Sequence, residues 1–256
     1  MFPEPIVRKA YIRCKEENYP ITKCTYDAMD GLYQLGIETV PFYGFGDIPN
    51  DVCDEVMVVG YIGDVLSALE IIGVPAPERM DYPESLKEFF GRKIWLSTLG
   101  EVRNSCTHNI FIKPYLEEKL FTGIIWNGTE SNRRHVVVHA DDVPVWISEP
   151  INFVSEFRCY IFNGIVLDVC RYKGLWCIGP DKQAVQNMVD EFIDAPISYS
   201  LDVGVLEDGR TLVVEVNDSY ALGNYGLNNV LYARMLMARW EQLVKDPRKK
   251  ILQIQG

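Results

Sequence analysis

The sequence YSLDVGVLEDGRTLVVEVN, residues 199–217, predicts two short apolar strands that are joined at the Asp208-Gly209 dipeptide. An Asp-Gly pair between two β-rich runs favours a tight hairpin, because both turn residues must tolerate positive φ. If the pairing is symmetric about this dipeptide, Asp202 lies directly opposite Glu215. Side chains alternate between the two faces of a strand, so Asn217 shares a face with Glu215.

This face of the hairpin carries an unusual set of polar groups. Two carboxylates that face each other across a ladder repel and destabilise the pair. Together with the amide oxygen of Asn217, the carboxylates of Asp202 and Glu215 give three hard oxygen donors. Mg²⁺ is bound in proteins by a few such oxygens, with places left for water and phosphate. The alternative is an acidic face that is simply solvated, which is common, and the hairpin alone leaves both interpretations open.

The composition restricts the classes of function. The net charge of the 256 residues is −11 without a long basic run, which argues against a nucleic-acid-binding surface. The first residues lack a cationic and then apolar signal, and no apolar run reaches about 18 residues, so we expect neither secretion nor a membrane partner. Seven scattered cysteines without zinc-ribbon spacing favour reduced thiols in a cytoplasmic protein.

The first part of the chain alternates between predicted strands and helices. β-like segments at 6–12, 37–42 and 55–60 alternate with helical segments at 26–35 and 64–72. This alternation predicts a small lobe with a parallel sheet.

A proline-rich passage at 74–83 is the expected boundary of this lobe. We therefore predict an N-terminal α/β lobe over 1–84 and a second domain over 85–256. The elements expected beyond the boundary are helices at 85–90, 181–192 and 228–244, and strands at 92–95, 109–115, 136–138 and 143–147.

A second hairpin is predicted about the Asn163-Gly164 dipeptide, which is among the strongest turn signals. Symmetric pairing places Glu156 opposite Arg171. The simplest role for these two residues is a cross-strand ion pair.

Three cations of this second hairpin are expected on one side of the sheet. By the same register, Arg158, Arg171 and Lys173 share a face. In a chain of net negative charge, such a row predicts a polyphosphate site, because arginine offers a planar fork and lysine a point charge.

A further cation lies at the end of the strand predicted at 109–115. Lys113 precedes a proline after two apolar residues, so its charge is partly buried unless an anion pairs with it. The Thr122-Gly123 step that follows has backbone amides suited to covering phosphates, and Lys119 lies in the same covering loop.

The order of these motifs resembles one known family. In chain order the motifs are FIKP at 111–114, FTG at 121–123, WISEP at 146–150, SEFRCYIFNG at 155–164, VCRYKG at 169–174 and the hairpin at 199–217. The set is similar to the ATP-grasp superfamily, and most to its small stand-alone clade marked by one arginine and two lysines. The resemblance is close over about 113–226 and loose in the N-terminal lobe. It implies an α/β protein with α+β lobes, in which a parallel pre-ATP-grasp lobe (1–84) precedes an ATP-grasp domain (85–256) whose two subdomains sandwich the nucleotide.

The resemblance also implies roles for the residues that bind ATP. Lys113 would contact the α- and β-phosphates, with Lys119 as a weaker candidate. Ser148 and Glu149 would belong to the hinge that holds adenine. Either Glu149 or Glu156 would bind the ribose hydroxyls.

The reacting end of ATP would meet the two hairpins. Arg158 and Lys173, the expected catalytic residues, would face the γ-phosphate, while Asp202, Glu215 and Asn217 would bind one or two Mg²⁺. The full set of expected ATP-binding residues is Lys113, Lys119, Ser148, Glu149, Glu156, Arg158, Arg171 and Lys173.

The implied activity is an ATP- and Mg²⁺-dependent ligation of a carboxylate to an amine through an acyl phosphate. The expected partners are ATP and unidentified carboxylate and amine substrates, which would be amino acids, peptides or proteins. Segment 217–226, rich in glycine and tyrosine, is either part of the acceptor pocket or a plain connection. Two alternatives to the ligase remain, a small-molecule kinase of the same fold and a nucleotide-binding module without turnover.

Overall fold

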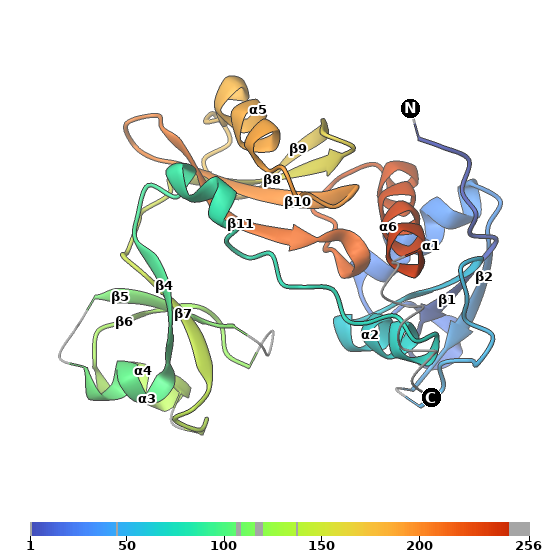
Figure 1. Ribbon diagram of the computed structural model, residues 1–256, viewed down its shortest axis with the longest axis horizontal. Coiled ribbons are helices and arrows are strands. Elements are labelled where there is room, and N and C mark those ends of the chain that lie inside the picture. Colours follow the sequence, from blue (N-terminus) through green and yellow to red (C-terminus); the bar gives the residue numbers. More distant parts are fainter. Residues whose placement is uncertain (1, 45, 106–108, 116–119, 137, 246–256) are drawn as a thin grey trace. The chain divides into compact units, whose positions relative to one another are not determined.

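The computed structural model describes residues 2–44, 46–105, 109–115, 120–136 and 138–245 (Figure 1). These residues divide into two compact units, one within Met1–Leu86 and Val154–Gly256 and the other within Lys87–Phe153. The predicted division into a lobe over 1–84 and a domain over 85–256 stays a prediction. Over the described ranges, no helix has both the length and the apolar character that crossing a membrane would require.

The first unit begins with the parallel sheet that the alternating pattern predicts. Its strands lie in the order β2-β1-β3, and they are β1 (Lys9–Arg13), β2 (Glu38–Phe42) and β3 (Val56–Val59). Helix α1 (Lys23–Gln34) follows β1, and helix α2 (Ile62–Ile71) follows β3. Both helices therefore begin at the carboxyl edge of the sheet.

The first helix has clear sequence signals at both ends. Thr22 caps α1 by accepting a hydrogen bond from the backbone N–H of Thr25, and Gly36 follows the helix with a φ of +74°. Only glycine adopts such a φ without strain, which is why it commonly ends a helix.

An antiparallel sheet forms the second part of this unit. Its order is β11-β10-β8-β9, and its strands are β8 (Ser155–Phe162), β9 (Ile165–Gly174), β10 (Ser198–Val205) and β11 (Thr211–Asp218). Every residue of β10 is buried, as expected for a strand inside a sheet that is covered. Helix α5 (Lys182–Glu191) lies next to β11.

The last helix, α6 (Asn229–Val244), joins the parallel sheet to the rest of the unit. It packs along α1 (Figure 1). Leu32 of α1 and Trp240 of α6 belong to one buried apolar core that also includes Ile12 of β1 and Tyr160 of β8.

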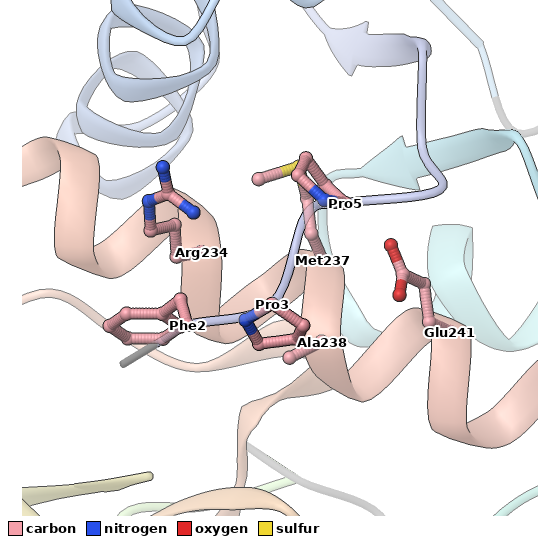
Figure 2. A pocket seen from close by; sticks show the side chains of 7 residues that line it. All are labelled: Phe2, Pro3, Pro5, Arg234, Met237, Ala238 and Glu241. Atoms are coloured by element: carbon pink, nitrogen blue, oxygen red, sulfur yellow. The ribbon is translucent and has the colours of Figure 1, made fainter.

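The N-terminal segment lies along α6, as Figure 2 shows. The carboxylate of Glu241 accepts hydrogen bonds from the backbone N–H groups of Ile6 at 2.6 Å and Val7 at 3.3 Å. The small hollow between the segment and the helix is lined by Phe2, Pro3, Pro5, Arg234, Met237, Ala238 and Glu241. The beginning of the described chain is thereby attached to its last helix.

The β10–β11 hairpin has the predicted central pair, although its turn is different. Asp202 pairs with Glu215, as expected. The loop has three residues rather than two, because Leu206 N–H bonds to the carbonyl of Arg210 and only Gly209 of the Asp-Gly dipeptide has positive φ. A bulge at Val214 shifts the register by one residue, so that the pairing from Glu215 onward is the predicted one.

The β8–β9 hairpin has the predicted two-residue turn. Asn163 and Gly164 both have positive φ, and Phe162 pairs with Ile165. Two bulges on β9, at Leu167 and Tyr172, shift the register further from the turn.

Because of these bulges, the predicted pairing of Glu156 with Arg171 is wrong. Glu156 lies opposite Lys173, and Arg171 lies opposite Phe157. Lys173 therefore shares the face of Arg158, whereas Arg171 is on the other face of the sheet. The row of three cations is reduced to two.

The second unit contains a separate antiparallel sheet of order β4-β7-β5-β6. Its elements are β4 (Ile94–Thr98), α3 (Leu99–Asn104), β5 (Ile110–Pro114), β6 (Ile124–Trp126), α4 (Glu130–Val136) and β7 (Pro144–Ser148), and a 3-10 segment, η2 (Glu84–Phe89), precedes them. Ile112, Trp126 and Val145 are buried in its core.

One prediction fails in this unit, and one helix was not predicted. The strand expected at 136–138 is not formed, because Val136 is the last residue of α4, where it is buried in the core, and Val138 lies in a turn. Burial of an apolar side chain here outweighs the β propensity of valine. Helix α3 was not expected from the sequence, although Thr98 caps it by accepting the N–H of Glu101.

Candidate active site

The acidic pair of the β10–β11 hairpin lies beside the amide of Asn217. The Nδ2 atom of Asn217 donates to Oε1 of Glu215 at 3.2 Å and lies 3.5 Å from Oδ2 of Asp202. Asp202 is only 2% exposed, which is incompatible with a solvated acidic face at this residue. The three side chains therefore converge on one point.

Arg158 holds Asp202 from the neighbouring strand. Its Nε donates to Oδ1 at 2.8 Å and its Nη2 to Oδ2 at 2.7 Å, so the pair is bidentate and buried. Burial raises the pKa of Asp202 to about 6, and the Arg158 guanidinium opposes this rise. The carboxylate is still ionised at neutral pH, where the charged pair is the stable form.

The other donors of Arg158 reach the segment that follows β11. Its Nη1 donates to the carbonyl of Gly223 at 3.0 Å, and the ring of Tyr225 lies 4.5 Å from the guanidinium carbon. A guanidinium has five N–H groups, of which these contacts use three. Two N–H groups remain without a hydrogen bond to any residue that the structure describes.

Lys173 and Glu156 lie opposite each other across β8 and β9. The ammonium group of Lys173 donates to Oε1 of Glu156. The lysine side chain is 65% exposed and that of Glu156 only 12% exposed. Arg171, on the other face, donates instead to the carbonyl of Gly174.

The remaining predicted residues belong to the second unit. Lys113 of β5 pairs in register with Trp146 of β7. The hydroxyl of Ser148 donates to the carbonyl of Glu149 at 3.0 Å. The carboxylate of Glu149 accepts the backbone N–H of Lys93 at 2.9 Å, and the backbone N–H of Glu149 donates to the carbonyl of Lys93. Lys119 lies outside the described residues.

Tyr160 is a site residue that the sequence did not identify. The backbone N–H of Tyr225 donates to its hydroxyl at 2.7 Å, and the hydroxyl reaches the carbonyl of Gly223 at 3.3 Å. Tyr160 is two residues after Arg158 on β8 and so shares its face. That spacing was a usable signal, but nothing in the sequence indicated that Gly223 would approach this face.

Asn224 connects the same segment to the start of α1. Its Nδ2 donates to Oδ2 of Asp27 at 2.9 Å, and its backbone N–H bonds to the sulfur of Cys24 at 3.2 Å. We call residues 222–227 the connecting loop. This loop contacts Arg158 on one side and helix α1 on the other.

The donor set at the hairpin fits a magnesium ion. Among the described residues, no three His, Cys, Asp or Glu side chains lie together as a metal site. A third protein ligand beside Asp202 and Glu215 would be the amide oxygen of Asn217. A carboxylate oxygen has two lone-pair sites, which allows Oδ2 of Asp202 to keep its bond to Arg158 while it binds a metal. The amide has to rotate to present its oxygen, since its nitrogen now faces the carboxylates.

The chain matches one known protein family. A family model matches residues 89–235, which is more than half of the 256 residues. It describes an ATP-grasp domain, family 2 of the clade that is named for one arginine and two lysines. No curated protein matches the sequence.

Solved structures of two ligases and a synthetase have a similar fold. A D-alanine–D-alanine ligase from Bacillus anthracis is 14% identical, with a TM-score of 0.54 over 98% of this chain and 100% of that chain. An L-amino acid ligase from Bacillus licheniformis is 12% identical, with a TM-score of 0.57 over 94% of this chain and 76% of that chain. A D-cycloserine synthetase is 14% identical, with a TM-score of 0.59 over 92% of this chain and 99% of that chain. At these identities the similarity establishes the fold.

Proposed function

The chain belongs to the ATP-grasp domain family, in family 2 of the clade named for one arginine and two lysines, and from this premise we propose that it is an ATP- and Mg²⁺-dependent ligase that joins a carboxylate to an amine. The observation that carries the proposal is the convergence of Asp202, Glu215 and Asn217 beside Arg158. This set pairs metal-binding oxygens with a buried cation, as transfer of a phosphoryl group requires.

In this proposal the hairpin of β10 and β11 holds the metal. Asp202, Glu215 and Asn217 supply the oxygen ligands, and Arg158 fixes the orientation of the Asp202 carboxylate. When bound, Mg²⁺ would supply positive charge that stabilises the phosphate groups during transfer. Rotation of the Asn217 amide completes the ligand set.

The cations of β8 and β9 serve the γ-phosphate. The two remaining N–H groups of Arg158 donate to its oxygens, and Lys173 moves from Glu156 to the same group. Lys173 has the freedom for this movement, because its side chain is largely exposed. Arg171 is left out of the proposal, since the register places it on the other face.

The nucleotide is bound further by residues of the second unit. Lys113 serves the α- and β-phosphates, and the backbone around Ser148 and Glu149 reads adenine. Either Glu149 or Glu156 binds the ribose. Glu149 is already oriented by its hydrogen bond from Lys93, which favours a fixed role for its second oxygen.

The reaction needs no protein nucleophile. An oxygen of the substrate carboxylate attacks the γ-phosphorus, the bond to the β-phosphate oxygen breaks, and ADP leaves. The nitrogen of the amine then attacks the acyl carbon of the acyl phosphate and loses a proton as inorganic phosphate departs. The protein contributes position and electrostatic stabilisation. We further propose a reducing, cytoplasmic setting, which the unbonded cysteines of the described part support.

Substitution of the two carboxylates tests the metal assignment. Asp202→Asn and Glu215→Gln keep the size of each side chain and remove its charge. We expect each to lower ADP release by at least about 100-fold, a loss typical of a group that stabilises transferring charge. The measurement is ADP release with amino acids, dipeptides and Mg-ATP.

Asp208→Asn is the matched control, because Asp208 is an exposed acid in the turn of the same hairpin. Full activity in both site variants would contradict the assignment of Asp202 and Glu215 as metal ligands. A stable phosphorylated product without an amide would indicate a kinase and not a ligase. Tight binding of Mg-ATP without ADP release would favour a nucleotide-binding module.

A further inference from the structure

Arg13 has a guanidinium group that the protein does not satisfy. It is the last residue of β1, and its side chain is 15% exposed. Its single hydrogen bond to a described residue is from Nη1 to Oδ1 of Asp64, at a long 3.4 Å. The Nε atom is buried and has no hydrogen-bond partner among the described residues. A buried donor of this kind costs free energy unless an acceptor arrives.

Other buried arginines of this chain are paired differently. Arg158 and Arg239 each make a bidentate pair with an aspartate, at 2.6–2.8 Å. Asp64, by contrast, is already used by the fold, because its Oδ2 accepts the N–H of Tyr61 at 2.9 Å at the start of α2. The guanidinium group of Arg13 therefore makes fewer and longer hydrogen bonds to described residues than those of Arg158 and Arg239.

The position of Arg13 is where a sheet of this kind binds ligands. The order β2-β1-β3 places β1 in the centre, because the chain passes from β1 to β2 on one side and then returns across β1 to form β3 on the other. Ligands of open α/β sheets bind outside the carboxyl ends of the strands at such a point. Arg13 is the residue at the carboxyl end of that central strand.

Helix α1, which begins beyond this edge of the sheet, contacts the connecting loop of the candidate active site. The carbonyl of Arg13 accepts the N–H of Ile21, which leads directly into the cap of α1. In the first turns of α1, Cys24 and Asp27 bond to Asn224 of the loop. The loop is in turn held by Arg158, the partner of Asp202, and all these elements lie in the first unit (Figure 1).

We propose that Arg13 binds the unreacted carboxylate of an amino-acid or peptide substrate. The proposal rests on the ligase function proposed above. The Phe42 ring, 5.4 Å from the guanidinium carbon, supports one face of the group and fixes its plane. The edge formed by Nε and Nη2 is the one that carries no hydrogen bond to a described residue, and this fork matches a carboxylate bidentately.

Substrate preference tests the assignment. ADP release is measured with amino acids and dipeptides that have a free α-carboxylate and with the same molecules as α-carboxamides. We expect the unsubstituted protein to prefer the free acids by about 10- to 100-fold in kcat/KM, the range for a charged hydrogen-bonded pair. Arg13→Gln should abolish this preference, and Arg13→Lys should retain part of it.

Lys9→Gln is the matched control. Lys9 is a cation on the same strand and face, but its ammonium group already forms an ion pair with Asp51 at 2.8 Å. Its loss should leave the preference for free acids unchanged. An unchanged preference in Arg13→Gln, or equal use of acids and carboxamides by the unsubstituted protein, would overturn the role of Arg13.

A spectroscopic measurement separates this proposal from the ligase function. The ¹⁵N–¹H signal of the Arg13 Nε–H group, assigned by its absence in Arg13→Lys, is followed in the full chain with Mg-ADP. It should shift when the free acids are added and stay unchanged with the carboxamides. No shift with any free acid overturns the site even if ADP is released, whereas a shift without ADP release supports the site and counts against the ligase.

Discussion

The hydroxyl of Tyr160 shows how one buried polar atom shapes the candidate site. It accepts the N–H of Tyr225 and lies within reach of the carbonyl of Gly223. Burial raises the pKa of Tyr160, so the hydroxyl keeps its proton and can donate. Tyr160→Phe would leave the Tyr225 N–H without its acceptor. We expect a loss of about 1–3 kcal/mol in the free energy of unfolding, measured by urea denaturation, and faster hydrogen exchange at the Tyr225 amide.

Tyr199→Phe controls for the removal of a buried hydroxyl. Tyr199 is 1% exposed, and its hydroxyl has no hydrogen-bond partner in the part of the chain that the structure describes. Its removal should leave stability unchanged or slightly raised, because an unsatisfied buried group is lost. Equal losses in the two variants would contradict the role of Tyr160 in holding the connecting loop.

At the scale of elements, the contact between α1 and α6 depends on Gly31. A Cβ atom at this position would lie 1.9 Å from the carbonyl oxygen of Asn229 and 2.9 Å from Cβ of Ala233. Alanine normally stabilises a helix by about 1 kcal/mol relative to glycine. Here we expect Gly31→Ala to destabilise the protein by about 1–3 kcal/mol, because the helices must separate. Thermal and urea unfolding measure the change.

Gly179 supplies the comparison for this substitution. An added Cβ there has no atom within 4 Å, and its φ is not positive. Gly179→Ala should change the free energy of unfolding by less than about 0.5 kcal/mol. If Gly31→Ala were as stable as Gly179→Ala, the close contact of the two helices would be refuted.

At the scale of the whole molecule, Mg-ATP should stabilise the folded state, because only that state assembles the site. A ligand at 100 times its Kd adds about 2.7 kcal/mol to the free energy of unfolding. We expect a gain of this size from urea denaturation with Mg-ATP. EDTA should remove most of it, as should the double substitution Asp202→Asn with Glu215→Gln.

Asp208→Asn should retain the full gain, since it removes a negative charge of the same hairpin at an exposed position. A double variant that gained as much from Mg-ATP as the unsubstituted protein would exclude these two residues as metal ligands.

The predictability of the two hairpins differs for a physical reason. In the β10–β11 hairpin, the longer loop and the bulge at Val214 shift the register in opposite directions, so Asp202 still pairs with Glu215. In the β8–β9 hairpin both bulges add a residue to β9, and their shifts accumulate. The position of a turn can be predicted from the local sequence, whereas a bulge depends on how a strand packs against its neighbours.

The sequence by itself determined the parallel lobe, most helices and strands, the family resemblance and the facing carboxylates. These features follow from periodicity, turn dipeptides and the order of motifs, which are local properties. The tertiary structure alone decided that Arg158 pairs with Asp202, that Tyr160 holds the connecting loop, and that Arg13 has an unsatisfied donor. These are contacts, or missing contacts, between segments far apart in the chain, and only packing brings such segments together.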